Sequence, residues 1–122
     1  WTHVALTYDG ADLLLYVDGV VALTESDSAG LDLGGAGTWS IGASWDGVSA
    51  ATGFWEGLLD EVRMWGVART GAQLQETMCE PITGNESDLL GYWPIGESND
   101  FTDASLNARH LTESGSPGVQ LF

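Results

Sequence analysis

The chain has 122 residues, of which 43% are hydrophobic and six are Trp. This length suits one domain, and the apolar content excludes an intrinsically disordered chain. Three Arg and no Lys stand against 18 acidic residues, so the net charge of −15 repels phosphate backbones and excludes nucleic acid as a partner. No apolar run approaches the ~20 residues of a membrane span. Cys79 is the single cysteine, so the chain cannot build a disulfide framework or a cysteine zinc site.

The first part of the sequence predicts three antiparallel strands. Strand-type residues alternate from Trp1 to Tyr8, and two further strands are expected over Leu13–Val17 and Val20–Thr24. The dipeptide Asp18-Gly19 between the last two is typical of a type I′ hairpin. The three strands should therefore pair in chain order.

Glycine-rich loops follow, over 25–37 and 43–53, with a short extended segment at 38–42 between them. We expect Phe54–Trp65 to be the longest strand, with an ion pair between Glu61 and Arg63 on one of its faces. Thr70 and Gln73 have capping-box spacing, which predicts a two-turn helix over 72–78. A last strand is expected over 89–94, before an irregular tail.

Short strands, turns rich in Gly and Asp, and a single small helix predict an all-β antiparallel sandwich. Three blocks of sequence resemble the concanavalin A-like, laminin-G-like jelly rolls. The first holds W-T-H-V-A-L-T-Y-D-G and L-L-L-Y-V-D-G within residues 1–19. The second holds I-G-A-S at 41–44 and W-E-G-L-L-D-E-V-R-M-W-G-V-A-R-T at 55–70. The third holds L-L-G-Y-W-P-I-G-E-S at 89–98 and D-A-S-L-N-A-R-H-L at 103–111.

The resemblance implies a single module over residues 1–122, with strands in 1–65, a short helix in 70–79, and a closing strand and tail in 89–122. It also implies that strands preceding the first block are absent, so that the chain is about the C-terminal two-thirds of a complete module. A neighbouring domain or subunit would then supply the missing strands. An unpaired strand edge recruits whichever strand is nearby, which keeps a role in an extracellular assembly open.

Catalysis is disfavoured by the arrangement of the carboxylates. Hydrolases of this fold need two carboxylates on one face of a strand, and no E-x-D-x-x-E motif is present. The nearest pair, Asp60-Glu61, is adjacent, and neighbouring side chains of a strand point to opposite faces. Neither His3 nor His110 is tied by a motif to a nucleophile, and we expect structural or surface roles for both.

Four residues are candidates for binding a ligand through the loops. Trp39, Trp45 and Trp55 lie in or beside variable loops, where an aromatic face can stack on the apolar surface of a sugar, and Asp46 follows Trp45. A structural role is the alternative for each Trp. By contrast, Trp1, Trp65 and Trp93 belong to strand blocks and are expected to fill the core or brace the sheet.

Calcium is the one cofactor with a case, since a hard cation takes several carboxylate and amide oxygens from a flexible loop. The candidate ligands are Glu97, Asn99, Asp100 and Asp103, in a segment that could equally be a solvated turn. Weaker candidates for a site at the rim of the sandwich are Asp27, Asp32 and Asp46.

The sequence thus predicts a non-catalytic extracellular or cell-surface module for recognition and adhesion. It would bind glycan or a surface protein through its loops, with calcium as a candidate cofactor and without membrane insertion. The alternative is a structural subunit or repeat of an extracellular assembly, and a glycoside hydrolase is a remote third hypothesis.

Overall fold

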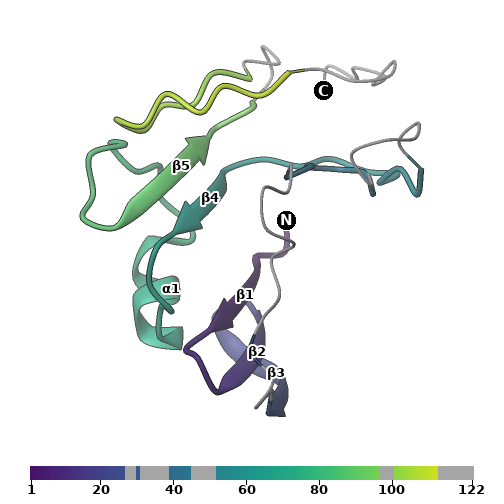
Figure 1. Cartoon of the computed structure of the whole chain (residues 1–122), viewed down its shortest axis with the longest axis vertical. Helices are drawn as coiled ribbons and strands as arrows, with labels where there is room; N and C mark the ends of the chain where they lie inside the picture. Colours follow the sequence, from purple (N-terminus) through teal and green to yellow (C-terminus); the bar gives the residue numbers. More distant parts are fainter. Residues whose placement is uncertain (27–29, 31–38, 45–51, 97–100, 113–122) are drawn as a thin grey trace.

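The computed structural model describes residues 1–26, 30, 39–44, 52–96 and 101–112. Within these residues the chain forms five strands and one helix, arranged as two antiparallel sheets (Figure 1). The prediction of an all-β antiparallel fold with one short helix is confirmed. No helix in the described part of the chain is long and apolar enough to cross a membrane.

The first sheet is a meander of β1 (Val4–Tyr8), β2 (Asp12–Val17) and β3 (Val20–Ser26). The β2–β3 turn has positive φ at both Asp18 (49°) and Gly19 (73°), as a type I′ turn requires. At the β1–β2 turn, the Asp9 carboxylate accepts hydrogen bonds from the N–H groups of Ala11 and Asp12. The three predicted strands and their hairpin are confirmed.

Helix α1 (Gly71–Thr77) begins at the predicted capping box. Thr70 accepts a hydrogen bond from the Gln73 N–H, and the Gln73 side chain accepts one from the Thr70 N–H at 2.9 Å. The helix packs against the first sheet through Gly71, where a Cβ would lie 2.6 Å from the Gly19 carbonyl oxygen. This close approach, which only glycine permits, covers Tyr16.

The second sheet pairs β4 (Val62–Trp65) with β5 (Leu89–Trp93) and contains most of the buried core. Leu89, Tyr92 and Trp93 of β5 are only 4 to 6% exposed. Trp93 is thus a core residue as predicted, whereas Trp65 is half-buried and stacks under the Arg69 guanidinium, 4.0 Å from the ring centre. Both Trp side chains therefore brace this part of the fold.

Three details of the sequence interpretation are wrong. The predicted strand Phe54–Trp65 is regular only over its last four residues, and the longest strand is β3. The predicted strand is interrupted at Glu61, where φ is 53° and the N–H donates a hydrogen bond to the Asp60 carboxylate instead of to a neighbouring strand. The described part of segment 38–42 is not a strand. Trp1 lies before β1 and is 88% exposed, so it neither fills the core nor braces the sheet.

Candidate functional site

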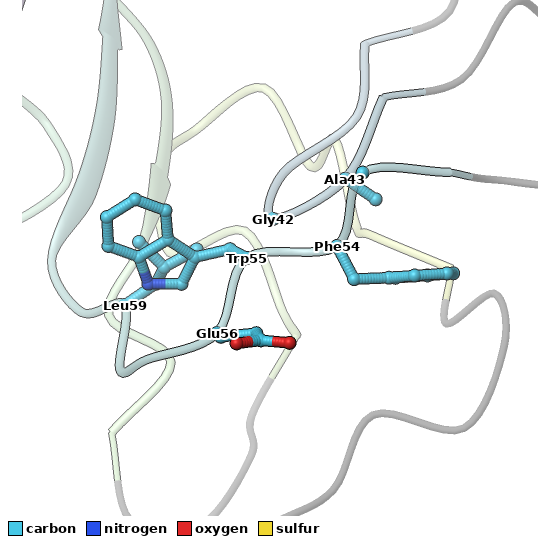
Figure 2. Close-up of a pocket in the computed structure, with 7 residues that line it drawn as sticks. Gly42, Ala43, Phe54, Trp55, Glu56 and Leu59 are labelled. Carbon is cyan, nitrogen blue, oxygen red and sulfur yellow. The ribbon is translucent and has the colours of Figure 1, made fainter.

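An open pocket of about 560 Å³ lies in the segments that lead into β4 (Figure 2). Its volume falls within the range of ligand sites, which is ~300 to 1,000 Å³. Two short stretches of chain meet at the pocket, and the lining residues are Gly42, Ala43, Gly53, Phe54, Trp55, Glu56 and Leu59.

Backbone hydrogen bonds hold these two stretches together. Ser44 and Thr52 exchange a pair of N–H to carbonyl bonds, at 2.8 and 2.9 Å. The Trp55 N–H donates to the Gly42 carbonyl at 2.8 Å. Gly42 has a φ of 77°, a conformation that favours glycine, and it lies close to Leu59. Main-chain hydrogen bonds therefore set the position of the two stretches.

Two aromatic side chains stand at the pocket with their rings largely in solvent. Trp55 is 61% exposed and Phe54 is 59% exposed, and their rings extend to opposite sides of the segment (Figure 2). The indole of Trp55 lies against Gly57, where a Cβ would be 2.8 Å from Nε1. Glycine at this position thus allows the indole to lie against the chain while most of its surface stays accessible.

Glu56 supplies the one charged side chain in the described lining of the pocket. Glu56 is exposed and directly follows Trp55, and Figure 2 shows its carboxylate below the segment that carries the two rings. A carboxylate accepts hydrogen bonds from hydroxyl groups, and an exposed aromatic ring packs on apolar C–H surface. The arrangement is therefore suited to a ligand that presents both hydroxyl groups and an apolar face.

A cluster of polar contacts fixes the chain just beyond the pocket. The Arg63 guanidinium donates to Glu61 at 2.6 Å and to the carbonyl oxygens of Thr77 and Glu80 at 2.8 and 2.7 Å. The predicted ion pair of Glu61 and Arg63 is confirmed. The Tyr92 hydroxyl also donates to Glu61. These contacts join the start of β4 to β5 and to the end of α1.

The strand-parity argument about Asp60 and Glu61 does not hold, because both residues precede β4 and Glu61 has a positive φ. Asp60 instead accepts hydrogen bonds from the N–H groups of Glu61 and Gly96. Glu61 is engaged by Arg63 and Tyr92. In the described lining, Glu56 therefore lacks the second carboxylate that a glycosidase mechanism requires.

Of the four predicted ligand-binding residues, one lines the pocket. Trp55 lines the pocket, whereas Trp39 is 63% exposed but is not among the lining residues. Trp45 and Asp46 lie outside the described residues. The lining residues that the sequence interpretation missed include Phe54 and Glu56. Their only sequence signal is adjacency to Trp55 at the end of a loop.

Of the predicted calcium ligands, only Asp103 lies within the described residues. It is 4% exposed, and its carboxylate accepts hydrogen bonds from the N–H groups of Tyr92, Ser105 and Arg109. Burial by itself would raise its pKa, but these bonds outweigh that effect and lower the pKa to about 2. Asp103 thus closes a loop onto β5.

Glu97, Asn99, Asp100, Asp27 and Asp32 lie outside the described residues. The described part of the chain contains no group of three or more His, Cys, Asp or Glu residues that could hold a metal ion. Calcium binding at this loop stays a prediction. Asp103 alone does not fit as a preformed ligand, since both of its oxygens already accept backbone hydrogen bonds.

The two histidines have structural contacts. The His3 N–H donates a hydrogen bond to the Asp18 carboxylate, and the Asp18 N–H donates one to the His3 carbonyl oxygen. Desolvation, aided by the charge of Arg63, lowers the pKa of His3. His110 accepts a hydrogen bond from the Asp103 N–H through Nδ1. Neither residue lines the pocket.

Comparison with known proteins gives one family match. Residues 1–75 match the family described as the concanavalin A-like lectin/glucanases superfamily. This stretch includes the first sheet, every pocket residue, β4 and most of α1. No curated protein and no solved structure matched the chain.

Proposed function

Because the chain belongs to the concanavalin A-like lectin/glucanase superfamily, we propose that it is a non-catalytic module that binds neutral glycans at the Trp55 pocket. The observation that carries this proposal is the Trp55 ring, 61% exposed, beside the Glu56 carboxylate in an open pocket. A pyranose ring matches both groups, because its C–H face packs on an indole ring and its hydroxyl groups donate hydrogen bonds to a carboxylate.

The charge of the chain argues for a neutral sugar over an acidic one. The net charge is −15, and the described pocket lining holds Glu56 and no basic residue. A uronic acid or a sulfated sugar at this site would meet a like charge without a cation to pair with it. We therefore expect neutral glycans to bind and anionic glycans to be rejected.

The same site supports the proposal of non-catalytic action. Both the retaining and the inverting mechanisms of glycoside hydrolysis use two carboxylates across the scissile bond. Glu61, which directly precedes β4, is held by Arg63 and Tyr92 and is not a lining residue. A module of this kind would attach a larger extracellular or cell-surface protein to a polysaccharide, which is an adhesive role.

A glycan array tests the proposal. The wild-type chain should bind neutral glycans and not sulfated or uronic glycans, and Glu56→Gln should relax that charge discrimination. The matched control is Trp1→Ala, because Trp1 is also an exposed Trp but is not among the pocket residues. Preferential binding of anionic glycans, or release of reducing sugar on incubation with any hit, would refute the proposal.

A further inference from the structure

The loop between α1 and β5 carries a three-residue sequence that the pocket does not use. Asn85-Glu86-Ser87 has the form Asn-x-Ser with a residue other than proline in the middle, which is the acceptor sequence for N-linked glycosylation. The other asparagines of the chain are Asn99 and Asn107, and neither is followed two residues later by Ser or Thr. Asn85 is therefore the only asparagine of the chain in an acceptor sequence.

A three-residue motif also occurs by chance, so its place in the fold decides whether it can carry a glycan. An N-linked glycan is bulky and hydrated, and its asparagine must therefore lie at the surface. Asn85 and Ser87 are both exposed, and residues 81–88 form neither helix nor strand. The loop thus presents the acceptor sequence to solvent.

The Asn85 side chain is held by its oxygen and not by its nitrogen. The Thr83 hydroxyl donates a hydrogen bond to Asn85 Oδ1. Nδ2, the atom to which a glycan is attached, donates no hydrogen bond within the part of the chain that the structure describes. By contrast, Asn107 donates through Nδ2 to the Leu89 carbonyl oxygen at 2.9 Å. A sugar on Nδ2 therefore disturbs no described hydrogen bond at Asn85, whereas it would crowd an existing one at Asn107.

Other contacts keep the loop in place. The Glu86 carboxylate accepts hydrogen bonds from the N–H groups of Thr83 and Gly84, at 2.8 and 2.9 Å. Gly84 has a φ of 88° and lies against the Ala104 carbonyl oxygen, so closely that a Cβ would clash with it. A glycan on Asn85 would leave both sets of contacts in place.

The loop is well separated from the Trp55 pocket. In Figure 1 the loop that enters β5 lies to the left of the β4–β5 pair, and the segment that enters β4 lies to its right. The described pocket lining runs over residues 42–59 and includes none of the loop. A glycan on Asn85 would therefore leave the pocket open.

We propose that Asn85 is a site of N-linked glycosylation, an inference that rests on the extracellular role proposed above. The donor is an oligosaccharide joined through a pyrophosphate to a membrane lipid. Asn85 Nδ2 attacks the anomeric carbon of the first sugar, a C–N bond forms, and the bond from that carbon to the pyrophosphate oxygen breaks. The lipid pyrophosphate leaves with the electron pair, and Nδ2 gives up one proton to a base of the transferring enzyme.

Mass spectrometry of the protein purified from its natural source tests the proposal. The chain has no Lys, so trypsin cleavage after Arg69 and Arg109 releases one peptide, residues 70–109, that contains every asparagine of the chain. We expect this peptide to carry the added mass of an oligosaccharide, and fragmentation to place that mass on Asn85. A peptide found only in unmodified form, or a glycan on another asparagine, would overturn the proposal.

Variants expressed in the same source test recognition of the acceptor sequence. Asn85→Gln and Ser87→Ala should each lose the added mass completely, whereas Ser87→Thr should keep it because Thr supplies the same hydroxyl group. Asn99→Gln is the matched control and should also keep the mass. Retention of the mass in Ser87→Ala would contradict modification through this sequence. Circular dichroism of each variant first establishes that it folds.

Binding of neutral oligosaccharide separates this inference from the proposed function. Asn85→Gln should bind as the wild type does, because Asn85 is not a lining residue of the pocket. A natural protein that binds sugar but has an unmodified Asn85 would overturn the glycosylation site alone. A protein that is modified at Asn85 but binds no sugar would overturn the Trp55 site alone.

Discussion

The Tyr92 hydroxyl lies 2.9 Å from both carboxylate oxygens of Glu61 and donates a hydrogen bond to that group. The contact connects the middle of β5 to the residue that precedes β4. Together with Arg63, it fixes the direction in which the chain leaves the Trp55 pocket. The rigidity of the proposed site therefore depends on a polar cluster outside the pocket.

Tyr92→Phe should remove stability below pH 10, and this loss should disappear as the pH rises toward 12. Burial, then the hydrogen bond and charge of Glu61, raise the Tyr92 pKa to about 12 from 10.0. Because the folded pKa lies above the ordinary value, the stabilisation is complete below pH 10 and is lost as the pH rises from 10 to 12. At neutral pH the variant should lose about 1.5 to 3 kcal/mol, the usual value for a hydrogen bond to a charged group. Urea unfolding at several pH values measures this, and identical alkaline profiles for wild type and variant would contradict it.

Asp103→Asn should destabilise the chain and reduce the fall in stability between pH 4 and pH 2. The Asp103 pKa is lowered to about 2, so its stabilisation is present above pH 4 and disappears as the pH falls toward 2. In the variant, the amide NH₂ would face one of the three N–H donors, with a cost of about 1 to 3 kcal/mol. Thermal melts from pH 2 to 7 test this. The loss should be the same with calcium and with chelator, whereas a calcium-dependent loss would identify Asp103 as a metal ligand.

Arg63→Lys should be poorly tolerated although the charge is kept. The Arg63 side chain is 9% exposed and donates to Glu61 and to two carbonyl oxygens, a set that the forked guanidinium satisfies and an ammonium cannot. We expect a loss of about 2 kcal/mol. The control is Arg69→Lys, which keeps the cation over Trp65 and should cost about 0.5 kcal/mol. Equal losses in denaturant titrations of the two variants would argue against this role for Arg63.

Gly84→Ala should be more damaging than Gly10→Ala. Both glycines have positive φ, 88° and 102°, so the backbone strain on substitution is similar. At Gly84 the new Cβ would lie 2.1 Å from the Ala104 carbonyl oxygen, whereas at Gly10 no atom lies within 4 Å. We expect about 1 kcal/mol for Gly10→Ala and at least about 3 kcal/mol for Gly84→Ala. The Tm values of the two variants measure this difference. Similar Tm values would contradict the prediction and mean that the loop at Ala104 shifts to accommodate the new Cβ at little cost.

Local signals in the sequence predicted the elements that local chemistry determines. The Asp18-Gly19 turn needs two positive φ angles, and the capping box of Thr70 and Gln73 satisfies the helix end with its own side chains. Neither feature depends on distant parts of the chain, so both could be predicted residue by residue. The same holds for the ion pair of Glu61 and Arg63.

Features that depend on distant contacts could not be predicted in this way. Alternation shows which residues of β1 share a face, but not that the face of Val4 and Leu6 is the exposed one. The segment before β4 has strand-type residues, yet its strand begins only after Glu61 adopts a positive φ. Asp103 is a residue type that often binds cations, but its carboxylate accepts hydrogen bonds from N–H groups of β5 and of residues 105–109. The sequence alone does not reveal these partners.

The measurement that tests the central claim most directly is a calorimetric titration of a neutral oligosaccharide, chosen as the best array hit, into three forms of the chain. Trp55→Ala should weaken binding at least tenfold, which is about 1.4 kcal/mol, because the stacking surface is lost. Wild type and Trp1→Ala should bind alike. Unchanged affinity in Trp55→Ala would contradict the assignment of the glycan site to this pocket.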